Sequence, residues 1–137
     1  MGRILGVDYG DSRIGLALSD PEKIIASPYR TLNNNNRPQM LDIFNTIIKE
    51  KNIEIIVLGL PISLKGNETL QTKKVRIFGQ ILEDFKIPII YQDERLSTIS
   101  AQNSLIKENI KTGHNKDVID KRAAAIILQQ YLDFNRK

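Results

Sequence analysis

The first third of the chain carries short apolar runs separated by polar turns, which is the pattern of paired strands. Residues 4–19 form two such runs around the polar turn DYGDS, and residues 26–32 form a third, shorter run. We therefore predict a β-hairpin followed by a third strand. Four consecutive asparagines, residues 33–36, come next and predict a solvated loop or the entry to a helix.

The apolar spacing changes after the asparagines. From Pro38 onward apolar side chains recur every three or four positions, which predicts an amphipathic helix over residues 38–51. Residues 53–61, IEIIVLGLP, are almost wholly apolar and predict a strand covered on both faces. Helical spacing returns over residues 68–85, and residues 87–94, IPIIYQDE, predict a fifth strand that ends in acids.

The last part of the chain is mainly helical by the same criteria. Residues 98–107 and 117–134 predict helices, and residues 110–116 predict a polar loop between them. The order of elements predicts an α/β fold: a five-stranded mixed sheet whose first three strands are antiparallel and whose two later strands run parallel to the first, with helices on both faces. We expect residues 1–137 to form a single domain, because this length suits one hydrophobic core.

Carboxylates interrupt the apolar pattern at the ends of predicted elements. Asp8 stands near the end of the first strand, and Asp93 and Glu94 end the fifth. If these strands run parallel, their ends share the sheet edge at which α/β proteins place their ligand sites. Asp120, near the start of the final helix, lies on the helix face that we expect to meet the sheet. The predicted topology therefore brings the acids toward one place.

Each acid also has an ordinary structural explanation. Asp8 stands in a turn, where aspartate often hydrogen-bonds its own backbone. Asp120 stands in a first helical turn, which favours negative charge, and Glu94 is followed by Arg95, with which it could form an ion pair. The combination nevertheless favours a shared site, because the topology assembles three acids from the ends of separate elements.

The surrounding residue types narrow the chemistry of such a site. Gly6, Gly10 and Gly15 leave room around Asp8 for backbone or for a charged ligand. The chain has no cysteine and one histidine, so carboxylate oxygens would bind a hard cation, Mg²⁺ or Mn²⁺, in preference to zinc. Two such ions about 4 Å apart, held by a shared aspartate, are an arrangement that hydrolyses phosphodiester bonds. The predicted chemistry is therefore that of a nuclease.

Charge and composition add weaker constraints. Lysine and arginine number 20 against 16 aspartates and glutamates, and the net charge of +4 suits a polyanionic partner such as nucleic acid. No apolar run approaches the roughly 20 residues that span a membrane, and the N-terminus lacks the layout of a signal peptide. We therefore expect a cytoplasmic protein without a membrane partner.

Four segments stand in order along nearly the whole chain: GVDYGDSRIGLALSD, VLGLP, YQDERLST and VIDKRAAAIIL. Together they resemble the signature segments of the YqgF family, whose members are described as pre-16S rRNA nucleases and as Holliday-junction-resolvase-like proteins. The resemblance implies an RNase H-like fold and metal-dependent cleavage of a nucleic-acid backbone. It also implies a role in 5′-end maturation of precursor 16S rRNA during ribosome biogenesis, with precursor rRNA as partner and branched DNA or pre-ribosomal particles as further candidates.

The resemblance carries over to individual residues. Asp8 matches the family's first-strand acid, Glu94 the acid of the DER segment and Asp120 the acid of the last helix, which implies that these three are catalytic and bind the metal. Asp93 is the alternative to Glu94 as a metal ligand, and strand alternation predicts that the two side chains point to opposite faces of the sheet. The candidate contacts to substrate are basic or hydroxyl side chains: Arg13, Lys65, Lys73, Lys74, Arg76, Arg95, Ser97, Thr98, Lys116, Lys121 and Arg122.

Three other functions remain open from the sequence. Resolution of DNA junctions would use the same metals and differ only in substrate. A protein that only binds rRNA during ribosome assembly would need no catalysis. The segment DYGDSRIG also resembles the phosphate-binding hairpin of actin-like and sugar-kinase ATPases, but such enzymes enclose the nucleotide with a second subdomain that 137 residues do not provide.

Overall fold

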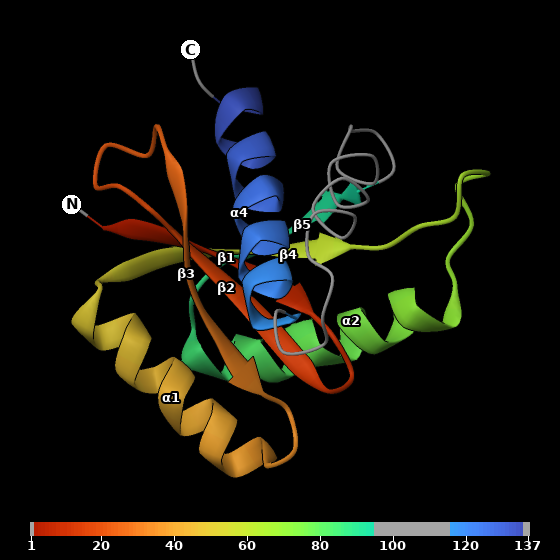
Figure 1. Ribbon diagram of the computed structural model, residues 1–137, viewed down its shortest axis with the longest axis horizontal. Coiled ribbons are helices and arrows are strands. Elements are labelled where there is room, and N and C mark those ends of the chain that lie inside the picture. The colour runs from red at the N-terminus through yellow and green to blue at the C-terminus, as the bar shows by residue number, and fades with distance from the viewer. Residues whose placement is uncertain (1, 95–115, 136–137) are drawn as a thin grey trace.

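The computed structural model describes residues 2–94 and 116–135, which form a five-stranded mixed sheet with helices on both faces (Figure 1). The strands are β1 (Arg3–Tyr9), β2 (Arg13–Ser19), β3 (Ala26–Asn33), β4 (Ile53–Leu60) and β5 (Ile89–Asp93). Their order across the sheet is β3-β2-β1-β4-β5. β1, β2 and β3 pair antiparallel, whereas β4 runs parallel to β1 and β5 runs parallel to β4. The predicted fold class and strand directions are therefore confirmed.

Three described helices cover the sheet, together with one short 3₁₀ turn. The helices are α1 (Arg37–Glu50), α2 (Leu70–Leu82) and α4 (Lys116–Phe134), and the 3₁₀ turn η1 (Glu83–Phe85) follows α2. α1 and α2 lie on one face of the sheet, and α4 crosses the other (Figure 1). No helix in the described ranges is long and apolar enough to cross a membrane.

The helix boundaries differ from the predicted ones by at most three residues. The helix predicted over residues 68–85 ends at Leu82 and tightens into η1, and Lys86 then leaves helical geometry with a φ of 60°. Lys116 was predicted to end a loop, but it is the first residue of α4. The helix predicted over residues 98–107 and most of the loop predicted after it lie outside the described residues.

The asparagine tract has two structural roles. Asn36 caps α1, because its side-chain oxygen accepts a hydrogen bond from the backbone N–H of Gln39 at 3.1 Å. Asn34 holds the turn between β1 and β2: its side-chain amide donates to the carbonyl of Gly10 at 3.0 Å, and its backbone N–H donates to the carbonyl of Ser12 at 2.9 Å. The predicted helix entry is confirmed, and the tract also fixes the hairpin.

The sheet separates two apolar cores. The larger core lies between the sheet and the helices α1 and α2, and it includes Leu5 and Val7 of β1. The smaller core lies against α4 and includes Ile4 of the same strand. Successive side chains of a strand point to opposite faces, so this alternation decides which residues of β1 face α4. The even-numbered positions of β1, which include Gly6 and Asp8, belong to the α4 face.

Candidate functional site

Asp8 lies at the carboxyl end of β1, on the face of the sheet that α4 covers. A Cβ placed on Gly6 would lie 2.7 Å from the Cβ of Leu128 in α4, and Asp8 follows Gly6 by two residues on the same face. The next residue, Tyr9, packs on the other side, with its ring centroid 4.6 Å from that of Phe78 in α2. Tyr9 therefore anchors the end of β1 and leaves Asp8 directed toward the α4 side.

Asp120 reaches the same place because α4 rests on the backbone of β2. Gly15 is the β2 partner of Asp8, and a Cβ placed on Gly15 would lie only 2.0 Å from the carbonyl oxygen of Asp120. The space that the missing side chain leaves is therefore filled by the first part of α4. Arg13, two residues before Gly15 on the same face of β2, donates its Nε–H to Oδ2 of Asp120 at 2.7 Å.

Glu94, the residue directly after β5, also lies on this face. Its Oε2 would lie 3.3 Å from a Cβ placed on Gly59 of β4, on the side where Ile127 of α4 also packs. β4 lies between β1 and β5, and its Gly59 follows Leu58, the partner of Val7. Gly59 thus stands beside Asp8 in the register of the sheet, and Glu94 faces the same side as Asp8.

Asp93 lies on the opposite face. It is the β5 partner of Leu60, whose side chain belongs to the core beneath α1 and α2. Neighbouring residues of paired strands point to the same side of a sheet, so Asp93 is directed away from α4. The register therefore favours Glu94 over Asp93 as the companion of Asp8 and Asp120.

Asp8, Glu94 and Asp120 lie on the same face of the sheet, near the carboxyl ends of β1 and β5, but their side chains do not form a metal-binding cluster. In residues 2–94 and 116–135, no group of three or more histidine, aspartate or glutamate side chains is close enough to hold a metal ion. The carboxylate of Asp120 is engaged by Arg13. The donor atoms are carboxylate oxygens, which suit Mg²⁺ or Mn²⁺ in kind. The chemistry of the residues thus fits a hard cation, and the ion pair with Arg13 occupies one of the donors.

Glu94 has an unfavourable environment for its charge. Burial raises the pKa of its carboxyl group, and the neighbouring charge of Asp93 raises the same pKa further. A carboxylate that is removed from water loses hydration, so the protein without a cation disfavours the ionised form. A positive ion beside Glu94 would oppose both effects.

We expect Glu94→Gln to stabilise the cation-free protein near neutral pH. The folded state holds the Glu94 proton more tightly than the unfolded chain, so the stabilisation from this group is present at low pH and is lost as pH rises through the raised pKa. The amide of glutamine does not ionise, so the variant does not lose this stabilisation as pH rises. Thermal denaturation in EDTA should show a higher midpoint for the variant at about pH 7 and nearly equal midpoints at about pH 4.

Glu54→Gln is the matched control, with the opposite expected sign. A hydrogen bond from Lys23 lowers the pKa of the Glu54 carboxyl in the folded protein. The ionised carboxylate therefore stabilises the fold at pH values above the pKa of the unfolded chain, and this stabilisation is lost as pH falls through the lowered pKa. The amide should lower the midpoint near neutral pH. A Glu94→Gln midpoint at or below that of the unmodified protein at about pH 7 would contradict the interpretation of the Glu94 environment.

The predicted substrate contacts are spread over several surfaces. Lys74 of α2 forms an ion pair with Asp11 in the β1–β2 turn at 3.2 Å, and Arg76 pairs with Glu68. α2 covers the face opposite to the acids, and Lys65 stands exposed in the loop that precedes it. The residues predicted as contacts but lying outside the described part of the chain, or without a described side chain, are Arg95, Ser97, Thr98 and Lys116.

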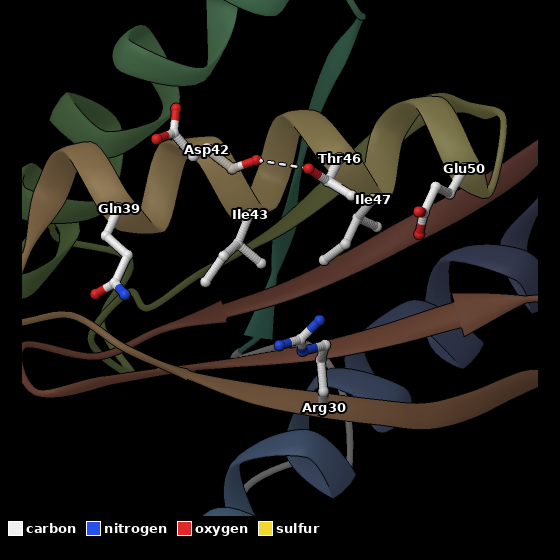
Figure 2. Close-up of a pocket in the computed structure, with 7 residues that line it drawn as sticks. All are labelled: Arg30, Gln39, Asp42, Ile43, Thr46, Ile47 and Glu50. Atoms are coloured by element: carbon white, nitrogen blue, oxygen red, sulfur yellow. Dashed lines mark hydrogen bonds between the residues drawn. The ribbon is translucent and has the colours of Figure 1, made fainter.

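A separate cavity lies between α1 and β3, with a volume of about 240 Å³. Arg30 of β3 points toward α1, from which Ile43 and Ile47 project toward it (Figure 2). Thr46 of α1 donates its hydroxyl hydrogen to the carbonyl of Asp42 at 3.1 Å. Arg30 is the partner of Leu16, which belongs to the core beneath α1 and α2. This cavity is therefore on the other face of the sheet from the acids.

Nearly the whole chain matches known proteins in sequence. Residues 2–134 match the model of the RuvX family, which is described as Holliday junction resolvase. A protein of Maridesulfovibrio salexigens named "Putative pre-16S rRNA nuclease" is 40% identical over 131 residues, which cover 95% of this chain and 97% of the relative. A protein of the same name from Dictyoglomus turgidum is 39% identical over 132 residues, covering 96% and 94%.

Solved structures share the fold at low sequence identity. RuvC of Thermus thermophilus, solved in complex with a Holliday junction substrate, has a TM-score of 0.57 and 14% identity, covering 96% of this chain and 94% of that one. The fowlpox virus resolvase, solved with Holliday junction DNA, has a TM-score of 0.55 and 12% identity, covering 98% and 99%. These likenesses establish an RNase H-like fold. From the family match and the relatives, the chain belongs to the RuvX family, which is the YqgF family that its motifs resemble.

Proposed function

We propose that this protein is a nuclease that uses Mg²⁺ or Mn²⁺ to hydrolyse RNA phosphodiester bonds, and that it acts in the cytoplasm in 5′-end maturation of precursor 16S rRNA. Membership of the RuvX family makes it a hydrolase that acts on phosphodiester bonds. The observation that carries the proposal is the placement of Asp8, Glu94 and Asp120 on one sheet face at the carboxyl ends of β1 and β5. The names of the curated relatives favour RNA as the substrate.

The acids and their neighbours have distinct roles in this proposal. Asp8, Glu94 and Asp120 would hold the cation through carboxylate oxygens, and a cation bound there supplies an activated water and a charge that stabilises the leaving oxygen. The protein contributes the scaffold: Gly15 lets α4 rest on β2, which fixes Asp120 beside the register position of Asp8. The net charge of +4 attracts the phosphate backbone, so binding should weaken as salt concentration rises.

Branched DNA is the second candidate substrate, and the description of the RuvX family favours it. The two candidates differ in substrate and share the same acids. The deciding experiment gives the purified protein a precursor 16S rRNA fragment with its 5′ leader and, in parallel, a four-way DNA junction. Each substrate is incubated with Mg²⁺, with Mn²⁺ and with EDTA.

The proposal expects metal-dependent cleavage of the RNA on the 5′ side of the mature end and at least about tenfold slower cleavage of the junction. Preferred cleavage of the junction would make the protein a DNA resolvase. Binding of precursor rRNA or pre-ribosomal particles without cleavage, in any of the metal conditions, would instead indicate an assembly factor that lacks catalysis.

A further inference from the structure

We propose that Arg13 is a positioning residue that controls cation binding: it holds the Asp120 carboxylate, and a divalent cation must displace its guanidinium to bind. The proposal rests on the proposed function, because it concerns the same acids. It rests on different evidence from the proposed function, however, namely the ion pair between Arg13 and Asp120 and the backbones that carry these two residues.

The ion pair has the geometry of a strong contact. Nε of Arg13 lies 2.7 Å from Oδ2 of Asp120, which is a short charge-assisted hydrogen bond. The two side chains are 33% and 23% exposed, so water screens the pair only in part. A pair of this kind is worth more than a fully exposed surface pair, and a cation that needs the same carboxylate has to compete with it.

The backbones on both sides of the pair are fixed. Arg13 begins β2 opposite Asn33, and the adjoining turn is held by the hydrogen bonds of Asn34. Asp120 is held by the contact of its carbonyl group with Gly15. Release of the carboxylate therefore requires only side-chain rotation, and the long arginine side chain can rotate without any movement of the sheet or of α4.

Once it is released from Asp120, the guanidinium of Arg13 would be able to bind another anionic group. Arg13 lies on the α4 face of β2, at the edge where Asp8 is found. A substrate phosphate that arrives at this edge offers oxygen anions, and a guanidinium binds carboxylate and phosphate oxygens with the same fork of N–H donors. The arginine thus exchanges one anionic partner for another as metal and substrate bind.

The direction of the effect on cation affinity follows from charge and competition. Removing the guanidinium frees Asp120 and also removes a positive charge that repels the cation. Both effects strengthen cation binding. We therefore expect Arg13→Gln to bind Mn²⁺ about tenfold more tightly than the unmodified protein, with Arg13→Lys in between because lysine keeps the charge but has no planar fork of donors.

Isothermal titration with MnCl₂ measures these affinities, and Lys23→Gln is the matched control. Lys23 has the same 33% exposure as Arg13 and also forms an ion pair, with Glu54, at the opposite end of the sheet. Its loss should change the Mn²⁺ affinity by less than about twofold. In the unmodified protein, the Nε–H signal of Arg13 in NMR spectra should exchange with water faster after Mg²⁺ is added.

The outcomes separate this proposal from the proposed function. Equal or weaker Mn²⁺ binding by Arg13→Gln, or equal tightening by Lys23→Gln, would show that Arg13 does not control the site, while the metal site itself would stand. An Arg13 signal that Mg²⁺ leaves unchanged would count against the proposal in the same way. Absence of Mn²⁺ binding by both the unmodified protein and Arg13→Gln would overturn the metal-dependent function together with the proposal.

Discussion

Asp8→Asn is expected to lower metal-dependent cleavage by about a thousandfold and to leave the fold intact. The amide has nearly the shape of the carboxylate but neither its charge nor its affinity for a hard cation. Asp8 stands between Gly15 on β2 and Gly59 on β4, so it is the most central of the three acids in the sheet register. Initial rates on labelled precursor rRNA with Mn²⁺, together with circular dichroism spectra, measure both parts of the expectation.

Asp11→Asn is the matched control for this loss. Asp11 lies three residues further on, in the turn between β1 and β2; its side chain is 59% exposed and pairs with Lys74 across the surface. Removing its charge should leave most of the cleavage rate, since exposed ion pairs contribute little. If Asp8→Asn cut RNA at the unmodified rate, or if both variants lost activity equally, Asp8 would not be a metal ligand.

Gly15→Ala is expected to destabilise the protein by about 3 kcal/mol, which is the second large effect. The new Cβ would lie 2.0 Å from the carbonyl oxygen and 2.3 Å from the carbonyl carbon of Asp120. Both atoms belong to the backbone, so the clash is relieved only if α4 lifts from the sheet. Urea denaturation measures the loss of stability, and a lower cleavage rate in the folded fraction would report the displacement of Asp120.

Gly59→Ala separates this clash from the general effect of adding a methyl group to a strand. Its new Cβ would lie 2.6 Å from Cδ1 of Ile127, the end of a flexible side chain that can rotate away. The destabilisation should therefore be clearly smaller than that of Gly15→Ala. Equal losses would mean that the backbone contact between α4 and β2 does not limit the packing.

The fold was predictable because the signals that define it are local. The almost wholly apolar run that became β4 is covered on both faces, as its composition predicted. The hairpin, the third strand and both helical crossovers also follow from alternation and spacing within short windows. The end of α2 was less predictable, because the tightening into η1 leaves the apolar spacing up to Phe85 unchanged.

The internal contacts of the candidate site were not predictable in the same way. Strand alternation assigns Arg13 to a face, but its ion pair joins residues 107 positions apart, and the sequence predicted only a contact with phosphate. The sequence did indicate that Gly15 leaves room, but not that the backbone of α4 fills it. The sequence around Asn34 shows only a run of polar residues, so it does not predict the hydrogen bonds that Asn34 makes to the hairpin turn.

The helix α4 packs on one face of the sheet against β1, β2, β3 and β4, and this has a consequence for the order of folding. α4 follows all five strands in the chain, so Ile4, Ala17 and Val57 on that face meet water until the helix docks. Contacts between such distant segments form late, because a long stretch of chain must first be ordered. Asp120 arrives with α4, so Asp8, Glu94 and Asp120 share one face of the sheet only after this helix has docked.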